Sequence, residues 1–411
     1  VGVLTIRQNV NFFGYDKSTE YFSLVFLHEL THALGFLDGM FNYFPGGRSS
    51  TILQKDQRNY IITEKVVKKA KEYFNCNTLL GVELEDQGGS GSSISHWEQR
   101  YLLGDYMGAI IYQEEMAISD FTLALLEDSG WYKANYYTGG LFRFGKGRGC
   151  SFFSEKCVSN GNTQFPNEFC LKGSEDRCSS GHLFTGYCYI RTYNNEIPNR
   201  YQYFSNKKEG GFTPADYCPV FMANNTKAFY TTSCKIGNPK YGNAKELGET
   251  IGENSICVMS SLIPKSASQD LSSYTSSRAI CHEMECDFQN KQTKIKIGSN
   301  TIICPSNGGT IKDPNNFTGQ IECPEFNIVC TYTNFCNDLN SCIKAKSLTY
   351  DESKTSSGST NSTNSGNNGG GSQDDEKDDG TPAYSSIKKS DTKFLRIKKW
   401  INFLFVSLIL H

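Results

Sequence analysis

The sequence predicts an α+β protein in which a helical N-terminal region precedes a disulfide-rich, mostly irregular or β region and then a disordered stalk. Three observations predict this order. Apolar residues recur at helical spacing within residues 1–137. Fifteen of the 16 cysteines lie between Cys150 and Cys342. Residues 349–393 consist mainly of Ser, Asn, Gly, Asp and Lys, and they bury too little apolar surface to offset the entropy cost of ordering.

Two helices are expected in the N-terminal region. The first spans residues 18–34, where Ser18 or Thr19 supplies the cap and apolar residues follow at helical spacing. Gly35 stands where helices commonly stop in a left-handed conformation. The second helix spans residues 114–128, because apolar residues are frequent there and a glycine follows shortly after.

The cysteines predict an oxidising compartment. They are dense, irregularly spaced and lack CxxC pairs, which favours disulfides over the alternative of structural zinc sites. Their pairing cannot be deduced from the sequence. Cys323, Cys330, Cys336 and Cys342 follow one another at intervals of six or seven residues, as in a small growth-factor-like module.

The overall charge and the glycosylation motifs agree with export. The formal net charge is -2, so nothing in the balance indicates a nucleic-acid partner. Three Asn-x-Ser/Thr motifs begin at Asn224, Asn316 and Asn361. We therefore expect a glycoprotein that is secreted or held at the cell surface.

Residues 28–32 read HELTH, which is an HExxH motif. Residues four apart lie on one face of a helix, so His28 and His32 can direct their imidazoles at one metal ion. Glu29 is placed to act as a general base on a water molecule at that metal. The apolar sequence on both sides of the motif indicates a buried helix, where polar groups need partners.

A third metal ligand has two candidates on residue type alone. Asp38 stands at the position that the compact HExxHxxGxxH pattern gives to a histidine, and a carboxylate also binds metal. His96 is the other candidate, 64 residues after His32. His182 and His282 lie among the cysteines and are interpreted as ordinary histidines.

A family resemblance favours His96. The sequence HELTHALGF, followed by a long insertion with GVELEDQGG, then SHWE and Met107, resembles the leishmanolysin family of metzincins, which are surface proteases. In that family an insertion separates the zinc-helix glycine from the third histidine. The resemblance is close over residues 21–154 and looser beyond them.

The resemblance implies a zinc-dependent endopeptidase that cleaves proteins and peptides at the cell surface, with a role in cell adhesion. It implies one Zn²⁺ per chain on His28, His32 and His96, Glu29 as the general base, and Met107 in a tight turn beneath the metal. Imidazole sites also accept cobalt or nickel, so the choice of zinc rests on the ligand set and the family.

Five parts are predicted along the chain. They are a metzincin catalytic region over residues 1–137 with an insertion at about 36–95, a Cys-rich domain over 138–263, a Cys-rich growth-factor-like region over 264–348, a disordered linker over 349–393 and an apolar tail over 394–411.

Both ends of the chain carry expectations. Only 27 residues precede His28, where the family has a propeptide and an N-terminal subdomain, so we expect further residues upstream of Val1. The tail WINFLFVSLIL is too short to span a bilayer comfortably and follows a polar spacer, as in a signal for a GPI anchor. The alternative is the apolar side of a terminal helix.

Two other functions compete with peptidase activity. One is a catalytically incomplete or inactive surface protein whose Cys-rich region binds a partner or mediates adhesion. The other is a structural zinc site without hydrolysis, although such sites usually have four protein ligands and only Asp38 is an obvious fourth.

Overall fold

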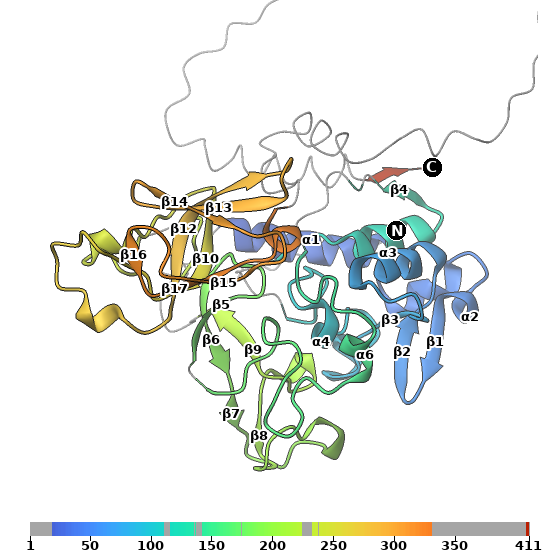
Figure 1. The fold of residues 1–411 in the computed structure, drawn as a ribbon. Helices are drawn as coiled ribbons and strands as arrows, with labels where there is room; N and C mark the ends of the chain where they lie inside the picture. Colours follow the sequence, from blue (N-terminus) through green and yellow to red (C-terminus); the bar gives the residue numbers. More distant parts are fainter. Residues whose placement is uncertain are drawn as a thin grey trace, which may run out of the picture.

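A computed structural model describes residues 19–110, 116–134, 136, 142–173, 175–223, 232–236, 238–330 and 408–410 (Figure 1). It contains helices, sheets and several disulfides, which confirms the predicted mixture of helix and sheet. The predicted linker, Cys336, Cys342 and most of the apolar tail lie outside the described residues. None of the described helices combines the length and the apolar composition needed to span a bilayer.

The helices are mostly short. The α-helices are α1 (Thr19–Leu34), α2 (Arg48–Thr51), α3 (Glu64–Phe74), α4 (Gln99–Leu102), α5 (Asp120–Asp128), α6 (Ser151–Ser154) and α7 (Phe326–Val329). The 3₁₀ helices are η2 (Asp38–Tyr43), η3 (Gly89–Gly91), η5 (Asn199–Tyr201), η6 (Thr213–Ala215), η8 (Lys245–Leu247) and η9 (Ser272–Tyr274).

The strands form one large antiparallel sheet and several small ones. The six-stranded sheet has the order β14 (Asn300–Cys304), β13 (Gln292–Ile297), β12 (Arg278–Asp287), β10 (Ser255–Ser260), β17 (Gln320–Cys323) and β15 (Gly309–Lys312). The three-stranded sheets are β1 (Ile52–Lys55), β2 (Arg58–Ile61), β3 (Val82–Glu83), and β5 (Asp176–Cys178), β6 (Thr185–Tyr189), β9 (Val220–Ala223). The pairs are β7 (Arg191–Thr192) with β8 (Glu209–Gly210), β11 (Ile263–Pro264) with β16 (Phe317–Thr318), and β4 (Tyr132–Ala134) with β18 (Leu408–Leu410).

The helix α1 begins and ends where the sequence predicts. Its buried stripe consists of Leu24, Leu27, His28 and Thr31, at the spacing that places side chains on one helical face. The chain leaves the helix at Gly35, whose φ of +135° is a conformation that side chains disfavour. A β-carbon there would lie 2.8 Å from the ring of Trp131, so both the backbone and the packing require glycine.

The second predicted helix begins later than expected. It is α5, which starts at Asp120, and residues 116–119 are not helical. The hydroxyl of Ser119 accepts hydrogen bonds from the backbone N–H groups of Phe121 and Thr122. Ser119 is therefore the N-cap, and its preference for that position outweighs the apolar pattern that continues upstream of it.

Two main hydrophobic cores hold the described residues together. The first contains residues from Leu24 to Met222, including the buried aromatic side chains of Phe74, Phe121 and Phe152. The second contains residues from Ala244 to Cys330 and underlies the six-stranded sheet. Figure 1 shows α3, α4 and α6 gathered near the small β1–β3 sheet, apart from the strands of the large sheet.

The division into domains stays a prediction, and contacts are found on both sides of two of its boundaries. The first core joins residues from both sides of position 137. The boundary at residue 263 falls between β10 and β12, which pair from Ser255–Glu283 to Ser260–Arg278 in one sheet. The predicted boundaries were based on where cysteines are frequent, whereas the hydrophobic cores are formed by apolar side chains on both sides of those boundaries.

Seven disulfides join the described cysteines, which overturns the alternative of cysteine zinc sites. The pairs are Cys76–Cys150, Cys157–Cys218, Cys170–Cys188, Cys178–Cys257, Cys234–Cys281, Cys286–Cys330 and Cys304–Cys323. Cys323 and Cys330 bridge to β14 and β12, not to each other. Both bridges lie within the predicted region over residues 264–348 and join the large sheet and its core, while the growth-factor-like character of that region stays a prediction.

Candidate metal centre

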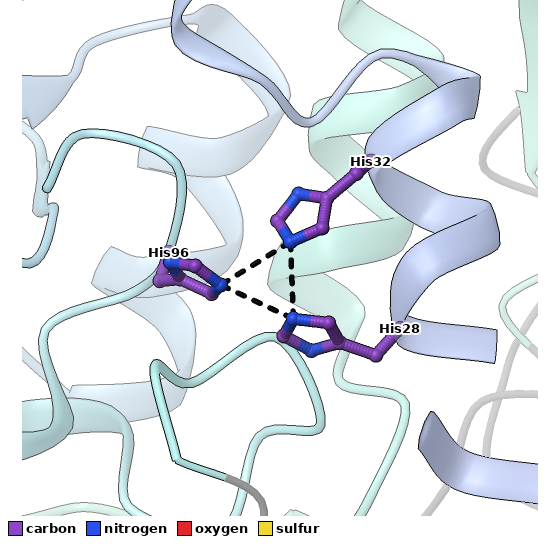
Figure 2. Close-up of side chains that lie close together, drawn as sticks. All are labelled: His28, His32 and His96. Atoms are coloured by element: carbon purple, nitrogen blue, oxygen red, sulfur yellow. Dashed lines mark hydrogen bonds between the residues drawn. The ribbon is translucent and has the colours of Figure 1, made fainter. Parts of the chain in front are cut away.

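Three histidines from distant parts of the chain meet at one point (Figure 2). His28 and His32 extend from α1, and His96 comes from the loop before α4. The Nε2 atoms are 3.0 Å apart for His28 and His32, 3.1 Å for His28 and His96, and 3.2 Å for His32 and His96. The described residues thus place all three sequence-predicted histidines in one cluster that is able to hold a metal ion.

Each of these imidazoles has its other ring nitrogen on a backbone carbonyl. The Nδ1 atoms of His28, His32 and His96 lie 2.7, 2.7 and 2.8 Å from the carbonyl oxygens of Tyr106, Phe36 and Ser92. A carbonyl oxygen only accepts, so each Nδ1 carries the proton. The Nδ1 contacts therefore turn each Nε2 toward the centre, which is the arrangement found in metal-binding histidines.

The electrostatics of the cluster fit a cation. Burial lowers the pKa of His28 and of His96 to about 4, so both rings are neutral near pH 7. The three Nε2 atoms face one another at 3.0–3.2 Å, and a positive ion among them would be bound by their lone pairs. Nitrogens held at roughly 2.05 Å by a tetrahedral zinc would be about 3.3 Å apart, which is close to the observed spacing. The three histidines therefore fit a zinc ion.

A tight turn beside His28 contains the predicted Met107. Met107 is fully buried, and its N–H donates to the carboxylate of Asp105 at 2.6 Å. The N–H of Gly108 donates to the carbonyl of Asp105 at 3.0 Å, which closes the turn. The turn presents the carbonyl of Tyr106 to His28, so its shape fixes the orientation of that ring.

Further hydrogen bonds brace this turn from two sides. The buried carboxylate of Asp105 also accepts from the hydroxyl of Thr122, and Trp97 donates its indole N–H to the same hydroxyl at 2.8 Å. Burial raises the pKa of Asp105 to about 6. On the other side, the hydroxyl of Tyr106 lies 2.7 Å from that of Thr31 in α1. The turn and the zinc helix are thus joined directly.

His96 is held by backbone pairing with the GVELEDQGG segment. The N–H of Glu85 donates to the carbonyl of His96 at 2.9 Å, and the N–H of Glu98 donates to the carbonyl of Glu83 at 3.1 Å. On the opposite edge, Trp97 donates to the carbonyl of Met107 at 3.0 Å. The segment that carries His96 therefore lies between the GVELEDQGG strand and the turn with Met107.

Asp38 and the two remaining histidines in the described residues have other partners. The carboxylate of Asp38 accepts from Arg48 at 2.6 Å and is not part of the histidine cluster. His182 and His282 are buried, and their Nδ1 atoms donate to the carbonyls of Cys257 and Gly248. They are satisfied structural histidines, as the sequence predicts.

The sequence does not indicate the groups that orient the three rings. The acceptors are backbone carbonyls of Phe36, Ser92 and Tyr106, and a carbonyl leaves no mark on residue type. The pairing of Thr31 with Tyr106 is similarly invisible, because it joins residues 75 apart. The N–H of Met107 donates to the side chain of Asp105, two residues earlier in the sequence. Aspartate commonly accepts such a bond in turns, so Asp105 is the one residue whose type indicates the turn.

Known proteins resemble this chain over most of its described length. The sequence model of the leishmanolysin family matches residues 1–337. A leishmanolysin homolog of Crithidia fasciculata is 31% identical over 313 residues, which cover 74% of this chain and 47% of that protein. Leishmanolysin of Leishmania tropica is 28% identical over 344 residues, covering 80% and 50%. A leishmanolysin-like peptidase of Drosophila melanogaster is 33% identical over 181 residues, covering 39% and 26%.

The chain aligns with about half the length of the first two relatives. The family match spans the zinc-helix motif, the loop with His96 and the Cys-rich residues up to 337. Leishmanolysins are zinc-dependent metalloproteases, and the histidine cluster has the donor set that such a metal needs. This chain therefore belongs to the leishmanolysin family.

Proposed function

We propose that this chain is a zinc-dependent endopeptidase with a metzincin core, in which His28, His32 and His96 hold one zinc ion and Glu29 is the general base. The observation that carries the proposal is the convergence of three Nε2 atoms, each on a ring that is oriented by a carbonyl at its Nδ1. A bound zinc ion supplies Lewis acidity and lowers the pKa of a water molecule toward about 7.

Glu29 is suitably placed for proton transfer. It follows His28 directly on α1, and its side chain is exposed, whereas that of His28 is buried. Its negative charge is felt by His96, where it opposes the lowering of the pKa that burial causes. Glu29 takes the proton from the attacking water and passes it to the leaving amine. Met107 packs within the turn that orients His28 and takes no part in proton transfer.

The first test compares Glu29→Gln with the wild type, both loaded with zinc. Glutamine has the same shape but cannot accept the proton, so cleavage of a casein-like protein should fall about 10²–10⁴-fold while zinc content stays at one per chain. Full activity in Glu29→Gln would refute the role of Glu29. A wild-type chain that holds zinc but cleaves nothing would favour the alternative of a catalytically incomplete Cys-rich surface protein.

The second test compares the two candidates for the third ligand. His96→Ala removes one of three nitrogens and should abolish stoichiometric zinc binding. Asp38→Ala removes only the exposed pair with Arg48 and should leave zinc content unchanged. Loss of zinc in Asp38→Ala, with retention in His96→Ala, would move the ligand to Asp38.

We also propose that the protein acts on protein or peptide substrates at the cell surface and contributes to cell adhesion. The seven disulfides support export to an oxidising compartment. Attachment through a GPI anchor rests on the apolar tail after residue 394, most of which lies outside the described residues. Release from membranes by a phosphoinositide-cleaving lipase would support the anchor, and retention after that treatment would contradict it.

A further inference from the structure

Five carboxylates form two overlapping groups near the segment that carries His96. Three of them, Glu83, Glu85 and Asp86, belong to the GVELEDQGG segment, and Glu98 follows His96 by two residues. The fifth, Asp216, comes from the Cys-rich region. One oxygen from each of Glu83, Glu98 and Asp216 lies within 4.8 Å of the others, and the same holds for Glu85, Asp86 and Glu98. Glu98 is thus the corner that both groups share.

Three of these carboxylates have cationic partners. Arg58 contacts Glu83 at 2.9 Å and Asp216 at 3.1 Å, and Arg200 contacts Asp86 at 2.8 Å. Among the described residues, neither Glu85 nor Glu98 forms an ion pair, although they are 1% and 0% exposed. Two buried carboxylates therefore lack a counter-charge, which matches the charge of one divalent cation.

The unpaired oxygens of these two residues have no hydrogen-bond donor either. Glu98 uses Oε1 to accept from the N–H of Arg100, and Glu85 uses Oε1 to accept from the N–H of Gln87. The Oε2 atom of each is buried and has no hydrogen-bond partner in the described residues. A cation satisfies both oxygens at once.

We propose that Glu85 and Glu98, with Asp86, Glu83 and Asp216 around them, form a second metal site that binds Ca²⁺. The donors are all carboxylate oxygens, which calcium prefers and which differ from the imidazoles of the zinc centre. Calcium binds oxygens at 2.3–2.6 Å, so two oxygens on one ion are separated by at most about 5 Å, and the oxygens within each group of three lie within 4.8 Å of one another. Magnesium needs oxygens at about 2.1 Å in an octahedron, which these groups reach less readily.

Calcium at this site would tie together three segments that position the third histidine. Glu83 and Glu85 lie on the segment that pairs with residues 96–98. Glu98 belongs to the histidine segment, and Asp216 belongs to the Cys-rich region. The site would therefore stabilise the fold around His96 without touching the histidine cluster.

Terbium luminescence provides a direct test on the full chain loaded with zinc, because Tb³⁺ replaces Ca²⁺ in oxygen sites and is excited by nearby aromatic rings. The hydroxyl of Tyr201 lies 3.2 Å from the Asp86 carboxylate, so this ring should excite the ion. We expect saturable luminescence that Ca²⁺ displaces. We also expect a melting temperature that rises by at least about 3 °C when Ca²⁺ is 100-fold above its dissociation constant.

Variants identify the site. Glu98→Gln and Glu85→Gln keep the Oε1 hydrogen bonds but remove charge, so each should weaken Tb³⁺ binding at least tenfold and reduce the Ca²⁺-dependent rise in melting temperature. Glu72→Gln, an exposed carboxylate on α3, is the matched control and should behave as wild type. If one glutamine variant does not fold, the other decides. Absence of Tb³⁺ binding to the wild type, or binding that both variants leave unchanged, overturns the proposal. These readouts do not depend on peptidase activity.

Discussion

The hydroxyl pair of Thr31 and Tyr106 offers a sharp test of how the turn is joined to the zinc helix. Both residues are fully buried, and their oxygens lie 2.7 Å apart. Thr31 donates its single proton to the carbonyl of Leu27 at 2.8 Å. The bond between the two hydroxyls is therefore donated by Tyr106 and accepted by Thr31.

This direction makes the two single substitutions unequal. Thr31→Val leaves the Tyr106 hydroxyl buried without an acceptor, which should cost about 2–3 kcal/mol of unfolding free energy. Tyr106→Phe removes the donor but leaves Thr31 bonded to Leu27, so its cost should be about 1 kcal/mol. The double variant replaces both partners with apolar groups of matching shape and should cost about 2 kcal/mol. The coupling energy is then at least about 1 kcal/mol.

Urea unfolding of the zinc-loaded protein with intact disulfides, followed by tryptophan fluorescence, measures all four forms. Tyr43→Phe is the matched control, because Tyr43 is 71% exposed and its substitution should change stability by less than about 0.5 kcal/mol. Costs that add without coupling, or a larger cost for Tyr106→Phe than for Thr31→Val, would refute the assigned direction of the bond.

Three other predictions follow from the same geometry. Burial lowers the pKa of His28 and His96 to about 4, so these two ligands take up protons only at low pH. Zinc affinity measured with a competing chelator should therefore fall more steeply than tenfold per pH unit only below about pH 5, and such a steep loss between pH 7 and pH 6 would contradict this. Gly35→Ala should lower the free energy of unfolding by about 3 kcal/mol in urea, because φ is +135° and the new β-carbon would lie 2.8 Å from Trp131. Gly39→Ala is the control and should have little effect, because the space around Gly39 is open. Paired alanine substitutions that remove the Cys304–Cys323 bridge, which spans 19 residues, should lower the free energy of unfolding by about 3 kcal/mol. Zinc content should stay unchanged, because both cysteines belong to the second core. Loss of zinc would show that the two cores are coupled.

The zinc helix was predictable because its signals are local. Helical spacing places His28 and His32 on one face, and Gly35 ends the helix where expected. The start of α5 was not predictable, because the apolar pattern upstream of Ser119 resembles that of a helix. Only the N-cap hydrogen bonds of the Ser119 hydroxyl mark the residue where the helix begins. Local pattern therefore predicts that a helix exists better than it predicts where the helix begins.

The position of His96 could not be derived from spacing, because it depends on pairing between distant segments. The backbone bonds that hold it come from Glu85, Glu83 and Met107, and none of these contacts has a period along the chain. Family resemblance indicated His96 because related sequences share the same fold, and the fold includes the pairing between these distant segments. Disulfide partners could not be derived from spacing either, because each bridge joins cysteines that only the tertiary fold brings together.

The residues that support His96 also contact the Cys-rich region. The strand that pairs with residues 96–98 carries Glu83, which shares Arg58 with Asp216. Arg100 donates to the carbonyls of Phe152 and Glu155. Both connections reach past residue 137 into the Cys-rich region. Because a buried charge that loses its partner is costly, we expect the position of the third histidine to depend on these contacts with the Cys-rich region.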